Sequence, residues 1–265
     1  MQPVTASNGL YLTLDDIKMH VQLSRDASVV MCPTSVVSVE NTAHGNVVPL
    51  DELRGIKRWA GENGVGVHLD GARVWHAVSV GGARLRDVGA CADAMTVSFS
   101  KGIGAPIGAM VVGSREIVGR MRRLRQSIGG GVRKVGMLAA AAREAVEENF
   151  GPGGVDERGV LEAGHAMARR VGELWTRRGG RLARPVETNL VWLDVSFAGV
   201  EAGIMNATGL NRGLLISSPR VVLHHQICEE ALVSLEEVFE DVLVRGPDGE
   251  ESEAPVALRG CVPSL

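Results

Sequence analysis

Aromatic residues and surplus basic charge are both scarce in this sequence. Phe, Trp and Tyr make up 3% of its 265 residues, and Tyr occurs once. So few rings argue against the stacking platforms with which proteins bind single-stranded nucleic acid. The 31 acidic side chains outnumber the 28 Lys and Arg, which gives a net charge of −3. We therefore expect no nucleic-acid partner, because binding to phosphates depends on an excess of basic side chains.

Paired cysteines and long apolar runs are also missing. The four cysteines are widely separated and form no C-x-x-C motif: Cys32, Cys91, Cys228 and Cys261. This spacing indicates neither a disulfide framework nor a zinc knuckle, and it favours a reducing compartment. No apolar run approaches the roughly 20 residues that span a bilayer. The opening residues, MQPVTASNGLYLTLDD, lack the basic flank and apolar stretch of a secretory signal. We expect a soluble, cytoplasmic protein with no membrane partner.

The composition and the order of patterns indicate an α/β protein. Apolar residues make up 45% and charged residues 22% of the chain, which is typical of a globular protein. Apolar runs alternate with helical patterns, which favours a parallel sheet with crossover helices. Strands are expected at residues 35–40, 65–70, 94–98 and 108–113, the last antiparallel, and helices at 50–63, 114–126 and 134–149. Five arginines in the second helix could suit nucleic acid, but the acidic total favours a solvated face.

A glycine- and proline-rich stretch, FGPGG at residues 150–154, is a candidate hinge. Beyond it we expect a helix at 159–178, a strand at 190–195, another helix, a strand at 221–224 and a helix at 229–244. The predicted domains are a large domain at residues 1–150 and a small α+β domain at 151–245. Residues 246–265 contain the acidic run PDGEESE and are predicted to form a disordered tail.

Two polar residues lie where ligands bind in open α/β sheets, at the carboxyl ends of strands. Asp70 closes the run VGVHLD, and Lys101 follows the run AMTVSFS. A carboxylate and an amine over one crevice match the needs of pyridoxal 5′-phosphate. The amine forms a Schiff base with the aldehyde, and the carboxylate keeps the pyridine nitrogen protonated. The spacing alone also fits a structural ion pair between Asp70 and Lys101.

Four motifs in order give a more specific indication. They are HLDGAR at 68–73, SFSKGIGAPIG at 98–108, ENT at 40–42 followed by VPL at 48–50, and IGGGVR at 128–133 leading into AAA at 139–141. Together they resemble the signatures of the low-specificity threonine aldolase family, and the similarity runs from about residue 14 to residue 244. This family consists of fold-type-I pyridoxal-phosphate enzymes in the β-eliminating lyase superfamily. The resemblance implies an aspartate-aminotransferase-like large domain, N-terminally incomplete, and a small α+β C-terminal domain.

The resemblance implies roles for particular residues. Lys101 would hold the cofactor covalently, and Asp70 would pair with its pyridinium nitrogen. Arg73 would help to hold the cofactor or the substrate carboxylate. Arg220 matches the small-domain arginine that clamps the substrate α-carboxylate, a task that suits a bidentate guanidinium. Arg133 matches an arginine that approaches the cofactor of a neighbouring subunit, although a surface position at a helix start fits it equally.

The histidines give weaker indications. His44 lies in a loop after a strand, and because such loops carry function we keep it as a candidate substrate-binding residue. His68 with His76, or His224 with His225, could be interpreted as metal ligands. A zinc site needs three or four convergent ligands, which no spacing here supplies. We therefore expect packed or hydrogen-bonded histidines and no metal.

The sequence departs from the family pattern at its start. Family members have an N-terminal segment that has no counterpart before residue 20 of this sequence. That segment contains a Gly-Thr phosphate cup, a serine near the substrate carboxylate and a histidine stacked on the cofactor. Val30 stands where the family has a second histidine, and Gln126 stands where it has a basic residue. We interpret the sequence as either a partial or mis-started gene model or a degenerate paralogue. The loss would remove sheet strands and expose apolar surface.

The implied activity is cleavage of L-threonine or L-allo-threonine into glycine and an aldehyde, within threonine catabolism and glycine biosynthesis. Two alternatives stay open. The first is an amino-acid racemase of the alanine type with the same cofactor, and the second is an inert truncated paralogue that acts as a binding partner. The family and the position of Arg133 predict a homodimer or homotetramer that acts on a small amino-acid substrate.

Overall fold

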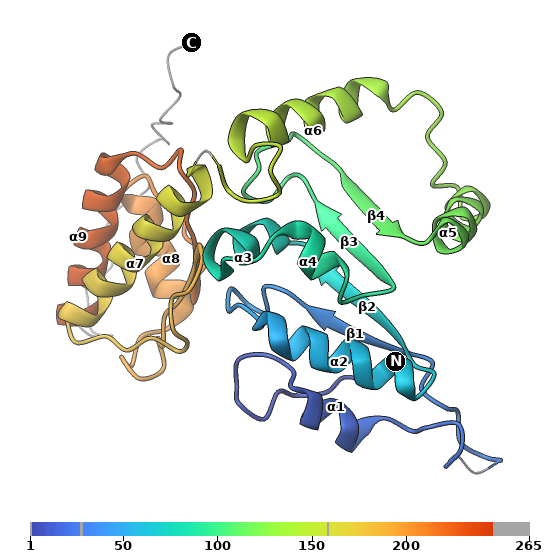
Figure 1. Ribbon diagram of the computed structural model, residues 1–265. Coiled ribbons are helices and arrows are strands. Elements are labelled where there is room, and N and C mark those ends of the chain that lie inside the picture. Colours follow the sequence, from blue (N-terminus) through green and yellow to red (C-terminus); the bar gives the residue numbers. More distant parts are fainter. Residues whose placement is uncertain (1, 27–28, 158, 246–265) are drawn as a thin grey trace. The chain divides into compact units, whose positions relative to one another are not determined.

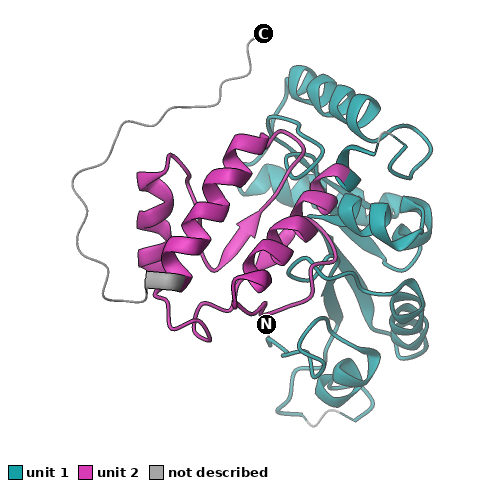
Figure 2. Cartoon of the chain, turned by 90° about the vertical axis from the view of Figure 1, so that its left-hand side faces the viewer, with its two compact units in different colours: residues 1–162 teal, residues 163–265 magenta. Residues whose placement is uncertain are grey.

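The computed structural model describes residues 2–26, 29–157 and 159–245 (Figure 1). The chain forms two compact units, residues 1–162 and 163–265 (Figure 2). Within the described residues, no helix combines the length and apolar character needed to cross a membrane. The predicted tail at residues 246–265 lies outside the described part of the chain, and the predicted domain boundary at residue 150 stays a prediction.

The first unit is built on a four-stranded sheet in the order β1-β2-β3-β4. The strands are β1 (Val36–Glu40), β2 (Gly66–Gly71), β3 (Ala94–Ser98) and β4 (Ala109–Gly113). The first three are parallel to one another, and β4 runs antiparallel to β3. All four predicted strands and the predicted direction of the last are confirmed.

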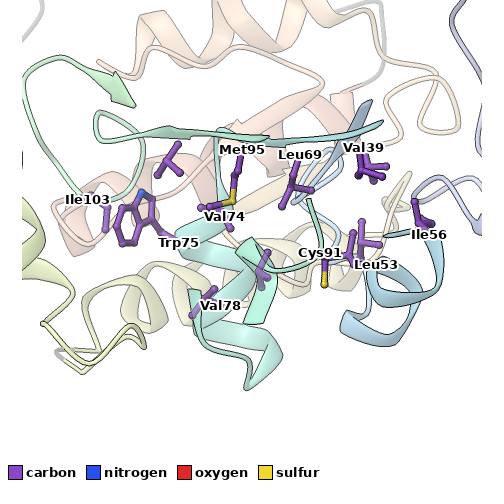
Figure 3. Packing of buried hydrophobic residues seen from close by; sticks show 14 of the residues in the cluster. Val39, Leu53, Ile56, Leu69, Val74, Trp75, Val78, Cys91, Met95 and Ile103 are labelled. Carbon is purple, nitrogen blue, oxygen red and sulfur yellow. The ribbon is translucent and has the colours of Figure 1, made fainter. Parts of the chain in front are cut away.

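One face of this sheet is covered by helices α2 (Leu50–Glu62), α3 (Val74–Gly81) and α4 (Leu85–Gly89) (Figure 1). Side chains alternate between the two faces of a strand. The buried residues Val39 and Leu69 therefore point toward the helices, where they meet Ile56, Val74 and Trp75 in one hydrophobic core (Figure 3). Residues at the intervening positions of β1 and β2 point to the opposite face.

Three further helices complete the first unit: α1 (Leu14–His20), α5 (Arg115–Ser127) and α6 (Gly136–Asn149). Helices α2, α5 and α6 were predicted, whereas α1, α3 and α4 were not. None of the residues of α5 is buried, and its five arginines are exposed. The interpretation of this helix as a solvated surface is consistent with that exposure.

The second unit has the elements predicted for a small α+β domain. Helix α7 (Val160–Arg177) leads into it, and strands β5 (Leu190–Trp192) and β6 (Arg220–Val222) form an antiparallel pair. Helices α8 (Ala202–Asn211) and α9 (Glu229–Arg245) complete it. Its own core contains Trp175 and Phe239, whose rings meet edge to face with centroids 5.0 Å apart.

Candidate active site

The carboxyl ends of β1 and β2 bring two acidic residues side by side. The parallel register pairs Glu40 with Asp70, and two residues earlier it pairs Ser38 with His68. The hydroxyl of Ser38 lies 2.8 Å from Nδ1 of His68, and Nε2 of His68 lies 3.1 Å from the hydroxyl of Thr96 on β3. This row of hydrogen bonds crosses three strands on the face opposite the helices. Glu40 and Asp70 lie on that same face, one alternation further along.

Asp70 is positioned by a tight turn into α3. One oxygen of its carboxylate accepts a hydrogen bond from the backbone N–H of Ala72 at 3.0 Å, which fixes its orientation. The intervening Gly71 leaves no room for a side chain, because a Cβ there would lie 2.7 Å from the carbonyl oxygen of Thr96. Arg73, at the N-cap of α3, follows half-buried.

Lys101 lies exposed on a loop that the rest of the unit holds firmly. The loop is closed by two backbone hydrogen bonds, from Phe99 N–H to Gly108 and from Ala105 N–H to Phe99, both 3.0 Å long. Ile103 anchors it, since its side chain is fully buried and its carbonyl accepts a hydrogen bond from the Asn149 amide at 2.7 Å. The amine of Lys101 therefore extends from a backbone that these hydrogen bonds hold in place.

Helix α3 also contacts the loop that carries Lys101. The indole N–H of Trp75 donates to the carbonyl oxygen of Ser98 at 2.7 Å, which joins α3 to the end of β3. Gly102, next to Lys101, has a φ of +83° and packs against the ring of His76. A Cβ on Gly102 would lie 2.8 Å from Cε1 of His76 and closer still to Nε2. The residues on either side of Lys101 are thus set by contacts with α3.

Four of the predicted site residues affect the electrostatics of Glu40. Burial among protein atoms raises the pKa of the Glu40 carboxyl above its usual range, and the charge of Asp70 raises it further. The charges of His44, Arg73 and Lys101 act on the same carboxyl and lower its pKa. The charges of four predicted site residues, from three segments of the chain, therefore act on one carboxyl group.

Glu40 itself was not among the predicted site residues. It belongs to the ENT motif, which entered the sequence analysis only as a mark of resemblance. The signal that could have found it is its position at the end of a strand whose parallel neighbour ends in Asp70. The sequence alone does not give the register between β1 and β2, which is what places Glu40 beside Asp70.

His44 lies in a tight turn directly after the ENT motif. Backbone hydrogen bonds of 2.8 and 2.9 Å join Ala43 and Asn46 in both directions across this turn. The two central residues, His44 and Gly45, have φ values of 51° and 95°, as a type I′ turn requires. The turn presents the exposed His44 side chain beside the end of β1.

Two predicted arginines lie elsewhere in the chain. Arg133 is exposed in the segment between α5 and α6. Arg220 begins β6 in the second unit, where its guanidinium carbon lies 6.0 Å from the ring centroid of Trp192. The roles assigned to both residues stay predictions.

Two of the remaining histidines, His68 and His76, are held by neighbouring residues. His68 is hydrogen-bonded to two hydroxyls, and His76 is buried against Gly102. Burial lowers the pKa of His224, and the neighbouring His225 lowers it further. In the described part of the chain, no three His, Cys, Asp or Glu residues gather as metal ligands would.

Comparison with known proteins gives a consistent family. The model of the β-eliminating lyase family matches residues 1–198. Alanine racemase TOXG of Cochliobolus carbonum is 46% identical over 247 residues, covering 93% of this chain and 63% of that protein. Aldolase vrtJ of Penicillium aethiopicum is 43% identical over 243 residues, covering 92% and 61%. Low-specificity L-threonine aldolase of Eremothecium gossypii is 36% identical over 237 residues, covering 89% and 60%.

A solved structure gives the same fold. The crystal structure of a putative L-allo-threonine aldolase from Listeria monocytogenes superposes with a TM-score of 0.67 at 24% identity. The superposition covers 88% of this chain and 65% of that one. The chain spans about three fifths of the length of the curated relatives named above.

Proposed function

The chain belongs to the β-eliminating lyase family, and from that membership we propose that it is a pyridoxal 5′-phosphate-dependent carbon–carbon lyase. Its substrates are β-hydroxy-α-amino acids such as L-threonine and L-allo-threonine, and its products are glycine and an aldehyde. The observation that carries the proposal is that Asp70 lies near the end of β2 and Lys101 follows β3, the neighbouring parallel strand, so both lie at the same carboxyl edge of the sheet.

The donor set at this edge fits the cofactor. Pyridoxal 5′-phosphate offers an aldehyde that an amine can bind covalently and a ring nitrogen that a carboxylate keeps protonated. Lys101 supplies the amine on an exposed loop, and Asp70 supplies a carboxylate oriented by the N–H of Ala72. Arg73 adds a guanidinium for an anionic oxygen of the cofactor or the substrate.

The residues of the chain bind and orient, while the cofactor, when bound, draws electrons from the α-carbon of the substrate. Arg73 binds the substrate α-carboxylate, a task for which the planar guanidinium fork is suited. The same role for Arg220 stays a prediction from the sequence. Holding the carboxylate fixes which bond of the α-carbon is presented for cleavage. His44, exposed beside Glu40, contacts the distal part of the substrate.

A homodimer or homotetramer in the cytoplasm is part of this proposal. Arg133 approaches the cofactor of a neighbouring subunit, and its exposure between α5 and α6 leaves it available for that contact. The reaction would serve threonine breakdown and glycine formation.

A second activity, amino-acid racemisation, has an observation in its favour. The relative that is 46% identical over 93% of this chain is named an alanine racemase. Racemisation needs the same amine and carboxylate but moves a proton at the α-carbon instead of breaking its bond to the β-carbon. Incubation with L-threonine and with L-alanine, followed by chiral analysis of the products, separates the two activities.

Borohydride trapping tests the cofactor site directly. The chain has four lysines, Lys18, Lys57, Lys101 and Lys134, so reduction with pyridoxal 5′-phosphate followed by peptide mass spectrometry can assign the modified residue. We expect one equivalent of label on Lys101. Lys101→Ala should abolish this label, and the control Lys134→Ala, at an exposed lysine, should leave it unchanged. Label spread over all four lysines would count against the proposal and favour a non-catalytic role.

A further inference from the structure

Glu40 lies at the carboxyl edge of the sheet. It ends β1 in register with Asp70. The contact of Ser38 with His68, two residues earlier on the same strands, shows that side chains in this alternation meet on the face opposite the core. Neighbouring protein atoms partly desolvate the Glu40 carboxyl, but the residue keeps enough exposed surface for a small molecule to reach it.

The other polar groups around Glu40 have positions that suit different tasks. In the proposed function, Lys101 and Asp70 hold the cofactor, and Arg73 is a permanent cation that cannot accept a proton. His44 stands on an exposed turn rather than on the sheet. Glu40 is thus the carboxylate at the sheet edge that the proposed function leaves without a task.

We propose that Glu40 is the general base that takes the β-hydroxyl proton of the substrate. This inference rests on the proposed function. In the step, the O–H proton passes to a carboxylate oxygen of Glu40, and the former hydroxyl becomes the carbonyl of the aldehyde. The bond between the α- and β-carbons breaks, and its electron pair stays with the α-carbon. The α-carbon then takes up one proton, which gives glycine and balances the reaction.

The environment of Glu40 suits this role. Its burial and the charge of Asp70 raise its pKa, while His44, Arg73 and Lys101 lower it. A carboxylate with a raised pKa is a stronger base than an ordinary glutamate. Cleavage is therefore expected to fall on the acid side as Glu40 becomes protonated.

The first experiment compares two reactions of the enzyme with pyridoxal 5′-phosphate bound. Threonine cleavage needs a base for the hydroxyl proton, whereas exchange of a glycine α-proton with D2O does not. We expect Glu40→Gln to lower the kcat of cleavage by about 100-fold or more and to keep glycine exchange within a few-fold. Glu40→Asp should retain part of the wild-type cleavage rate, and that rate should still fall as the pH is lowered. The control Glu62→Gln, at an exposed residue at the end of α2, should behave as the wild type.

The outcomes separate the two proposals. A Glu40→Gln enzyme that cleaves threonine at the wild-type rate, or that loses cleavage and exchange by the same factor, overturns the role of Glu40 alone. A wild-type protein that performs neither reaction overturns this inference together with the proposed function.

A second measurement needs no cofactor. The side-chain carboxyl ¹³C signal of Glu40 is assigned by its loss in Glu40→Gln and followed through a pH titration. Asp70→Asn should lower the titration midpoint of Glu40, and Lys101→Ala should raise it, because the two charges act on Glu40 in opposite directions. A midpoint that both substitutions leave unchanged would show that Glu40 does not face this site.

Discussion

Gly102 sets the backbone of the residue that would carry the chemistry. It has a φ of +83°, a region that costs an L-residue about 1–2 kcal/mol, and a Cβ there would press into His76. We expect Gly102→Ala to lower the free energy of unfolding by about 2 kcal/mol or more. It should also slow cofactor labelling of Lys101. Urea unfolding and timed borohydride trapping measure the two effects.

Gly61 offers a matched control for Gly102. It lies in helix α2, and a Cβ there meets no atom within 4 Å. Gly61→Ala should raise the free energy of unfolding by up to about 1 kcal/mol and leave the labelling rate unchanged. Equal labelling rates in the two alanine variants would mean that the Gly102 conformation does not position Lys101.

Single residues could be predicted from the sequence when a motif named them. Asp70, Arg73 and Lys101 were predicted as site residues, and the charges of all three act on the Glu40 carboxyl. Glu40 was missed because its motif served only as a mark of resemblance and no local feature placed it beside Asp70. Only the register between β1 and β2, which depends on packing across the sheet, puts it beside Asp70.

At the scale of elements, helix α1 owes its start to a capping box. The hydroxyl of Thr13 accepts from Asp16 N–H, and the Asp16 carboxylate accepts from Thr13 N–H at 2.9 Å. Hydrogen bonds from Thr13 and Ser7 lower the pKa of Asp16 from 3.8 to about 2. A carboxyl with a depressed folded-state pKa stabilises the protein above the unfolded pKa, and the effect is lost as pH falls through the folded pKa.

Asp16→Asn tests this capping box. We expect it to lower the free energy of unfolding by about 1 kcal/mol at pH 7. The difference from wild type should shrink as the pH falls from about 4 toward 2, as followed by urea unfolding at a series of pH values. Asp15→Asn, in the same first turn, removes only a 3.7 Å surface ion pair with Lys18 and should change stability little. A difference at Asp16 that is independent of pH would contradict the ionic cap.

The strands and long helices followed from the sequence, and the short helices did not. Strand β3 was predicted at its observed bounds, and α2 within one residue, because each has a clear apolar period and a clear stop. Helices α1, α3 and α4 have 7, 8 and 5 residues. Helices of that length are marginal alone and form through capping and packing, which a periodicity search does not detect.

At the scale of the whole molecule, each compact unit has its own hydrophobic core. Phe239 is fully buried in the second core against Trp175. We expect Phe239→Leu to destabilise the protein by about 1–3 kcal/mol. Hydrogen exchange read by mass spectrometry should accelerate in α7 and α9, while β1 to β3 keep their protection.

A matching substitution can be made in the hydrophobic core of the first unit. Ile56 is fully buried beneath the sheet, and Ile56→Val should cost about 0.5–1.5 kcal/mol. Its faster exchange should appear in α2 and the sheet and leave α9 protected. Equal acceleration in both units from either variant would show that the two cores unfold as one.

The hydrogen bond from Trp75 to Ser98 has an optical consequence. Trp75 lies at the base of the Lys101 loop, and its indole is fixed to the end of β3. Indole fluorescence falls in the wavelength range that a pyridoxal ring absorbs, so a ring held on Lys101 would quench Trp75 by energy transfer. The protein thus carries an intrinsic, label-free gauge of whether its lysine is occupied.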